Sequence, residues 1–94
     1  MALALVHHIV LAEGIPFRQF AAFLHAMLKD GGMVLLEFVP PDDSQVQRMT
    51  AAKPGLLDSY SLQAMRESFA PFFREKEKIL LEGTSRILFV FAKK

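Results

Sequence analysis

The sequence contains no cysteine, which excludes disulfide bonds and thiolate chemistry. It also has no long basic run: the formal net charge is +1, and the Lys and Arg residues are spread along the chain. Since a surface that follows a phosphate backbone needs a basic stripe, we expect no nucleic-acid partner. The apolar stretch Ala2–Ala12 is too short to span a bilayer and lacks the basic start of a secretion signal. These absences predict a soluble, cytoplasmic protein without membrane association.

Apolar residues, by contrast, are abundant. Of the 94 residues, 52% are hydrophobic, which is more than a lone domain of this size needs to fill its core. We interpret residues 1–94 as one domain that is either a part of a larger fold or a unit that associates with itself.

The most informative stretch is Ala2–Ala12, which reads ALALVHHIVLA and is apolar apart from His7 and His8. A strand with one face in water alternates polar and apolar residues, whereas a strand covered on both faces is apolar without interruption. The stretch therefore predicts an interior strand over Ala2–Ala12.

The next apolar patterns predict a strand–helix–strand unit. Residues 16–29 carry apolar side chains at helical spacing, and Met33–Val39 is a second apolar run of strand length. In one sheet this order implies parallel strands with a right-handed crossover. The remaining patterns predict a helix over 43–52 with Asp42 as N-cap, a helix over 61–70, and a hairpin of strands over 75–81 and 86–92.

Together these elements predict an α/β fold with a four-stranded mixed sheet and a C-terminal antiparallel hairpin. The expected order is the Ala2 strand, the Met33 strand, the Arg86 strand and, at the charged edge, the Glu75 strand. Both long helices are expected on one face. Because the other face and the edge of the first strand remain uncovered, we expect a homodimer, formed through the Ala2–Val10 strand edge, the uncovered sheet face, or both.

Three segments carry a resemblance to a known family. LALVHHIVL resembles the fourth strand of the class I S-adenosylmethionine-dependent methyltransferases, and Ala22–Val39 resembles the following helix, glycine turn and fifth strand. The end of the chain, SRILFVFAKK, resembles the family's last strand, which inserts antiparallel between strands five and six. The resemblance implies the C-terminal half of a Rossmann-like methyltransferase domain, which acts on a small-molecule acceptor.

The chain departs from this family in its glycines. The family's G-x-G-x-G loop and the acidic residue that holds the cofactor ribose have no counterpart here, since the glycines stand at separate turns. The resemblance thus implies S-adenosylmethionine for the whole domain, and we expect no cofactor on this chain and no activity from it alone. The alternative is a non-enzymatic module for dimerisation or interaction with a half-Rossmann fold.

Candidate site residues follow from the rule that open α/β sheets bind ligands beyond the carboxyl ends of their parallel strands. The rule selects His7, His8 and Glu37 as catalytic candidates, and Phe38 as a substrate-binding candidate. One histidine could serve as a general base, but neighbouring strand residues point to opposite faces, so both cannot line one pocket. The simpler interpretation is a histidine that is hydrogen-bonded at a strand end.

Glu37 also has two interpretations. It is either an acid in the acceptor pocket or a carboxylate paired with Arg86, His7 or His8. Arg48 and Tyr60 fall in the region that closes over substrate in the resembled family, and we therefore predict them to bind substrate. No third ligand lies near the two histidines in sequence, so we predict no metal site.

Overall fold

The structure is a computed structural model that describes residues 2–5, 10, 11 and 13–94. For residues 2–5 it describes the backbone only. The α/β class is confirmed. The elements in chain order are β1 (Ala2–Leu5), α1 (Phe17–Met27), β2 (Met33–Phe38), α2 (Ser44–Thr50), the 3-10 helix η2 (Pro54–Leu57), α3 (Leu62–Phe69), β3 (Phe73–Leu80) and β4 (Ile87–Lys93).

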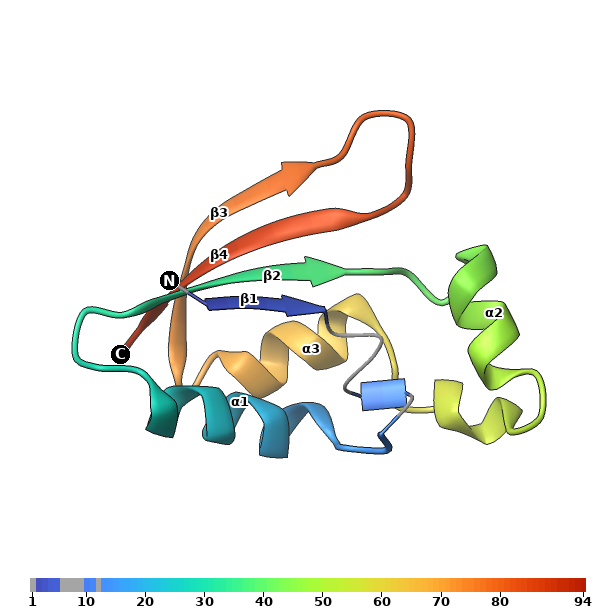
Figure 1. Ribbon diagram of the computed structural model, residues 1–94, viewed down its shortest axis with the longest axis horizontal. Helices are drawn as coiled ribbons and strands as arrows, with labels where there is room; N and C mark the ends of the chain where they lie inside the picture. Colours follow the sequence, from blue (N-terminus) through green and yellow to red (C-terminus); the bar gives the residue numbers. More distant parts are fainter. Residues whose placement is uncertain (1, 6–9, 12) are drawn as a thin grey trace.

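The four strands form one mixed sheet in the order β1-β2-β4-β3, which is the order expected from the sequence (Figure 1). β1 and β2 are parallel, with α1 as the crossover, and β4 is antiparallel to both β2 and β3. Phe38 at the end of β2 pairs with Ile87 at the start of β4, so the carboxyl edge of the parallel pair also holds the beginning of β4.

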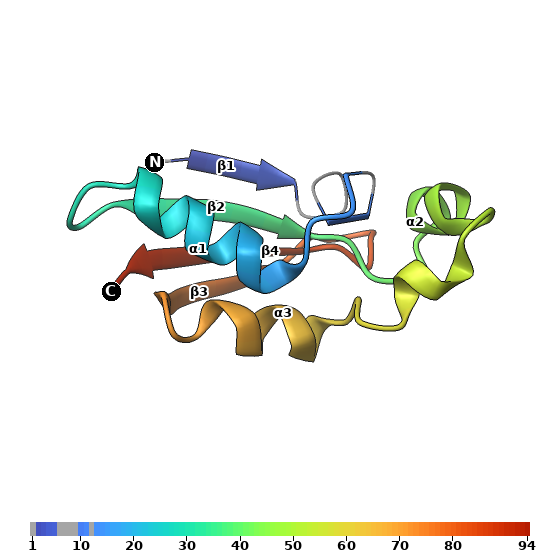
Figure 2. The same ribbon diagram turned by 90° about the horizontal axis from the view of Figure 1, so that it is seen from below.

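Both α1 and α3 cover the same face of the sheet, and α2 lies beyond the carboxyl end of β2 (Figures 1 and 2). Alternate residues of β2 are buried on the helical face, because successive side chains of a strand point to opposite sides. The core on this face is mainly aromatic and aliphatic. It includes Phe17, Phe20 and Ala21 of α1, Val34, Leu36 and Phe38 of β2, Met65 and Phe69 of α3, Phe73 of β3, and Phe89 and Phe91 of β4.

Each helix begins where its sequence supplies a suitable residue. Pro16, whose φ is fixed in the range that suits a helix start, precedes α1, and the hydroxyl of Ser61 accepts the N–H of Ala64 at the start of α3. The N-cap of α2 was predicted one residue too early. Asp43, not Asp42, caps α2, since its carboxylate accepts the N–H of Gln45 at 2.9 Å.

The predicted first strand is too long. β1 ends at Leu5, and Val10 and Leu11 are not part of a strand, so the edge is shorter than the predicted Ala2–Val10. Leu11 is only 4% exposed and packs into the core. The 3-10 helix at Pro54–Leu57, which begins with a proline, was also not predicted.

The prediction that β3 is a charged edge strand is confirmed. Phe73 is buried, and the following residues, Arg74 to Leu80, are all exposed. The pairing register with β4 shifts between Glu75 and Glu77, which is a bulge in this edge. In the described part of the chain, no helix is long and apolar enough to cross a membrane.

Candidate functional site

The carboxyl edge of the parallel strands gathers four separate parts of the chain. β2 ends there, β4 begins there, and the segments that hold α2 and η2 extend beyond it (Figure 1). Ligands of open α/β sheets bind at this kind of edge, where the connections that follow neighbouring strands diverge. The fold therefore places the candidate site at the end of β2.

Arg86 is the centre of a polar network at this edge. Its Nη1 donates to Glu37 Oε1 at 3.3 Å and its Nε to Asp43 Oδ2 at 3.4 Å. Its Nη2 donates to Gln45 Oε1 at 3.1 Å. One guanidinium thus connects β2, the N-cap of α2 and the first turn of α2 to the start of β4. The interpretation of Glu37 as a partner of Arg86 is confirmed, and a catalytic role for Glu37 stays a prediction.

The network also sets the charge state of Asp43, whose side chain is 15% exposed. Desolvation raises the pKa of this carboxyl, but the hydrogen bonds from the Gln45 N–H and from Arg86 outweigh it. The pKa of Asp43 therefore lies below its usual value, and two carboxylates share the positive charge of Arg86.

Tyr60 is buried in the core beside the end of β2. Its ring stacks between Phe17 and Phe38, with centroid distances of 5.5 Å and 5.3 Å, and its hydroxyl donates to the carbonyl of Val39 at 2.5 Å. Burial raises the pKa of this hydroxyl, against the opposing effect of the hydrogen bond to Val39. The hydrogen bond holds the chain that leaves β2 against the chain that enters α3.

The predicted site residues thus lie in different surroundings. Phe38 is 1% exposed and Tyr60 is 2% exposed, so both belong to the core under the edge, whereas Arg48 lies exposed on α2. His7 and His8 fall outside the described residues. A substrate or catalytic role for any of these residues stays a prediction.

Two adjoining hollows lie between the segment before α1 and the segment of α2 and η2. The larger has a volume of about 410 Å³ and the smaller about 110 Å³, and both are lined by Gly14 and Leu56. Glu13 and Lys53 supply opposite charges to the larger one, whose other lining side chains are Leu11, Met49 and Ala52. The larger volume lies within the range of small-molecule sites.

Sequence reasoning missed that Asp43 and Gln45 join the pair of Glu37 and Arg86. Two signals were present. The last strand was expected to be antiparallel to the Met33 strand, which puts the start of one at the end of the other, and Asp43 and Gln45 come within eight residues of Glu37. Polar residues that follow the end of one strand by only a few positions in sequence can contact a residue at the start of an antiparallel neighbouring strand.

The glycines do not form the cofactor cradle of the resembled family. Gly14, Gly31 and Gly83 each have a positive φ at a separate turn, and a Cβ on any of these three would meet no atom within 4 Å. The residues present therefore do not fit a complete S-adenosylmethionine site. Within the described residues, no three His, Asp or Glu side chains are grouped to hold a metal ion.

The fold and this edge define an α/β unit whose sheet is parallel on one side and closed by an antiparallel hairpin on the other. No family model matches the chain. The chain is 30% identical over 91 residues to the nodulation protein NoeA of Rhizobium meliloti (strain 1021). The alignment covers 97% of this chain but only 18% of NoeA, so the chain spans less than a fifth of that relative's length.

Proposed function

We propose that this chain is the substrate-side part of a class I S-adenosylmethionine-dependent methyltransferase. The observation that carries the proposal is the position of β4, which lies antiparallel between the parallel strand β2 and the edge strand β3. The resembled family ends its sheet in this way. A simple series of strand–helix–strand units would give only parallel neighbours, so this arrangement is a specific one.

The similarity to NoeA supports the same proposal. Nearly the whole chain aligns with a small share of a much longer protein, as expected of a part of a larger unit. Since the glycines here form no cofactor cradle, the cofactor contacts would come from another part of that unit. The isolated chain is then inactive, although it belongs to an enzyme.

In this proposal the carboxyl edge receives the methyl acceptor, a small molecule. His7 or His8 takes the proton of the attacking group, and Glu37, held by Arg86, orients the acceptor. Arg48 contacts substrate directly, and the buried rings of Phe38 and Tyr60 support the floor of the site.

Calorimetric titration with S-adenosylhomocysteine tests the proposal. The protein encoded by the whole reading frame that contains residues 1–94 should bind this ligand with a micromolar or lower dissociation constant. The isolated chain should give no heat of binding. In the whole protein, replacement of the active histidine by asparagine should lower turnover about 100-fold while ligand binding is kept. A whole protein that does not bind the ligand would contradict the proposal.

A second candidate function is the non-enzymatic association module. It is favoured by one observation, the uncharged outer edge of β1, which is suited to pairing with another strand. A natural reading frame limited to these 94 residues, together with no binding of S-adenosylhomocysteine, would favour the module over the enzyme.

A further inference from the structure

The two adjoining hollows described above lie between segments that follow neighbouring parallel strands. β1 and β2 are parallel neighbours, and the chain after β1 passes through Glu13 and Gly14 before it enters α1. The chain after β2 passes through α2 and η2, and residues of both segments line the hollows. The hollows are therefore at the carboxyl edge of the parallel pair, where open α/β sheets bind small molecules.

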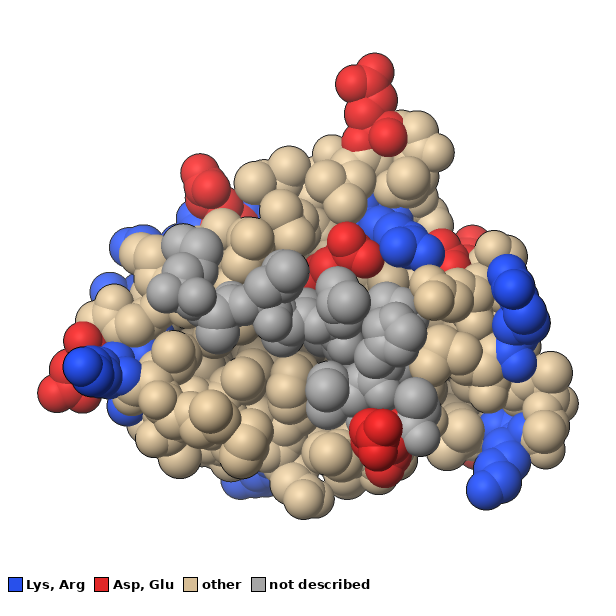
Figure 3. Space-filling view, in the orientation of Figure 1, with Lys and Arg blue, Asp and Glu red and all other residues tan. Residues whose placement is uncertain are grey.

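The larger hollow, of about 410 Å³, has two charged side chains of opposite sign in its described lining. Glu13 comes from the segment before α1, and Lys53 comes from the segment between α2 and η2. Both residues are exposed, and neither forms a salt bridge with another described residue. In the lower right of Figure 3, an acidic side chain and a basic side chain stand apart, with uncharged atoms between them. The two charges of the hollow are thus available to a ligand.

The smaller hollow, of about 110 Å³, adjoins the larger one at Gly14 and Leu56, which line both. Its described lining contains no charged residue and includes the apolar side chains of Val10 and Ile15. Gly14 has a φ of 70°, and a Cβ placed on it would meet no atom within 4 Å, so the space beside the junction is open. The pair of hollows is therefore charged at one end and mainly apolar at the other.

We propose that this pair of hollows binds a free α-amino acid with an apolar side chain. The carboxylate of Glu13 pairs with the ammonium group of the ligand, and the ammonium group of Lys53 pairs with its carboxylate. The apolar side chain of the ligand extends past Gly14 into the smaller hollow. Binding itself requires no methyl transfer, and only a role of this amino acid as the acceptor rests on the proposed function.

The opposite charges are the reason to choose a zwitterion. An anion that paired with Lys53 would be repelled by Glu13, and a cation that paired with Glu13 would be repelled by Lys53. A neutral ligand would leave both charges without a partner. An α-amino acid carries its two charged groups together and its side chain apart from them, which matches charges at one end of the hollows and an apolar lining at the other.

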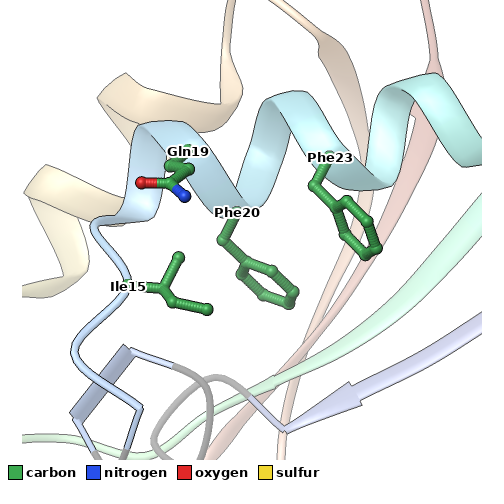
Figure 4. Close-up of a pocket in the computed structure, with 4 residues that line it drawn as sticks. All are labelled: Ile15, Gln19, Phe20 and Phe23. Atoms are coloured by element: carbon green, nitrogen blue, oxygen red, sulfur yellow. The ribbon is translucent and has the colours of Figure 1, made fainter.

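A separate hollow beside α1 provides a contrast. It has a volume of about 210 Å³, and its described lining consists of Ile15, Gln19, Phe20 and Phe23 (Figure 4). The amide of Gln19 is the one polar group among these four side chains. Because this lining offers no charge to a ligand, it favours no particular ligand chemistry, and we assign none. Two opposite charges beside an apolar hollow distinguish the proposed site.

Ligand analogues test the two charges without any change in the protein. The probe is L-leucine, added to the protein encoded by the whole reading frame that contains residues 1–94 and followed by saturation-transfer NMR. Since Glu13 and Lys53 are exposed, water screens both pairs, and we expect a dissociation constant of about 1 mM. Leucinamide lacks the carboxylate and N-acetylleucine lacks the ammonium group, so each should bind at least about fivefold more weakly.

Charge reversal should change which analogue is preferred. Lys53→Glu should weaken binding of L-leucine and strengthen binding of leucinamide, because the hollow then carries two negative charges. Glu13→Lys should instead strengthen binding of N-acetylleucine. A variant that had only lost its fold would bind all three ligands more weakly, and circular dichroism verifies folding independently.

A steric test uses two neighbouring alanines. Ala52 is exposed and lines the larger hollow, whereas Ala51 is exposed and is not in its described lining. Ala52→Trp should fill the hollow and weaken binding of L-leucine at least about tenfold. The matched control, Ala51→Trp, should leave binding unchanged.

Three results would overturn the proposal: no binding of L-leucine, equal affinities for L-leucine and both analogues, or an equal loss of binding in Ala51→Trp and Ala52→Trp. A fourth is a loss of S-adenosylhomocysteine binding in Ala52→Trp, because the hollow would then belong to the cofactor. The proposed function can fail separately. A whole protein that binds S-adenosylhomocysteine but not L-leucine contradicts this site alone, and one that binds L-leucine but not S-adenosylhomocysteine contradicts the methyltransferase alone.

Discussion

The two outer strands of the described sheet, β3 and β1, differ in charge. β3 carries five charged residues in a row, Arg74 to Lys78, with a bulge in the middle, and such an edge discourages further pairing. β1 is short and carries no charged residue. Charge of this kind is typical of a strand at which a sheet ends, and β1 does not carry it. The β2 side and the β3 side also differ in the contacts that hold them, and substitutions at Phe73, Tyr60, Arg86 with Asp43, and the Arg66–Glu75 pair test that difference.

The largest effect is expected at Phe73, which attaches β3 to the core. It is the one residue of β3 that is buried, and its ring lies 5.5 Å from that of Phe69 and 6.1 Å from that of Phe91. Phe73→Ala should lower the free energy of unfolding by about 3–5 kcal/mol, because it removes this contact and leaves a cavity. Urea unfolding measures it, with Lys76→Ala as a control expected to change stability by less than about 0.5 kcal/mol. Equal effects of the two would mean that β3 is not held by Phe73.

On the β2 side, Tyr60 packs against Phe38 at the end of the strand. Tyr60→Phe should lower the free energy of unfolding by about 1–2 kcal/mol. The substitution keeps the stacked ring but leaves the buried carbonyl of Val39 without its donor. Burial raises the pKa of the Tyr60 hydroxyl in the folded chain. The contribution of the protonated hydroxyl to the free energy of unfolding is therefore complete below the unfolded pKa of about 10, and it is lost as the pH rises above that value toward the folded pKa.

The chain has a single tyrosine and no tryptophan, so tyrosinate absorbance reports on Tyr60 alone. The folded chain should show little tyrosinate at about pH 11, whereas the urea-unfolded chain should be largely ionised. An ordinary titration in the folded chain would show that Tyr60 is not buried as described.

The contrast between the edges explains what the sequence could predict. The charged run of β3 and the unbroken apolar run at Ala2–Ala12 each have a direct meaning in terms of burial, and the strand order followed from them. The end of β1 did not follow, because apolar residues that leave a sheet to pack in the core, such as Leu11, look the same as strand residues.

In the candidate site, only the pairing of Glu37 with Arg86 was predictable from the sequence. Glu37 in an apolar strand required a partner, and Arg86 was among the few available. The burial of Tyr60 was not predictable, because an aromatic residue in a loop region fits a substrate site and a core equally well. Its place depends on the two rings that stack on it, and those come from distant parts of the chain.

Arg86→Gln tests the polar network that fixes the β2 side, with an expected loss of about 1–2 kcal/mol. The change leaves Glu37 and Asp43 as half-buried carboxylates without their shared cation. The lowered pKa of Asp43 gives a pH signature. Its contribution is present above the unfolded pKa of about 3.9 and is lost as the pH falls through the lower, folded pKa. Unfolding free energies of the natural chain and Asp43→Asn should therefore differ near neutral pH and converge below about pH 3. A difference that grows in acid would contradict the assignment.

The smallest effect is expected at the salt bridge on the β3 side. Arg66 of α3 donates to Glu75 of β3 through Nε at 2.9 Å and Nη2 at 2.7 Å, but the two side chains are 42% and 32% exposed. Solvent screening limits such a pair, so Glu75→Gln should cost less than about 0.5 kcal/mol, and the cost should vanish in high salt. Arg66→Ala should cost more, because the guanidinium also lies 5.6 Å from the ring centre of the buried Phe89. If Glu75→Gln and Arg66→Ala lower the free energy of unfolding by the same amount in low salt, the salt bridge and not the packing on Phe89 connects α3 to β3. Charge would then stabilise the attachment of β3 as well as discourage further pairing at its edge.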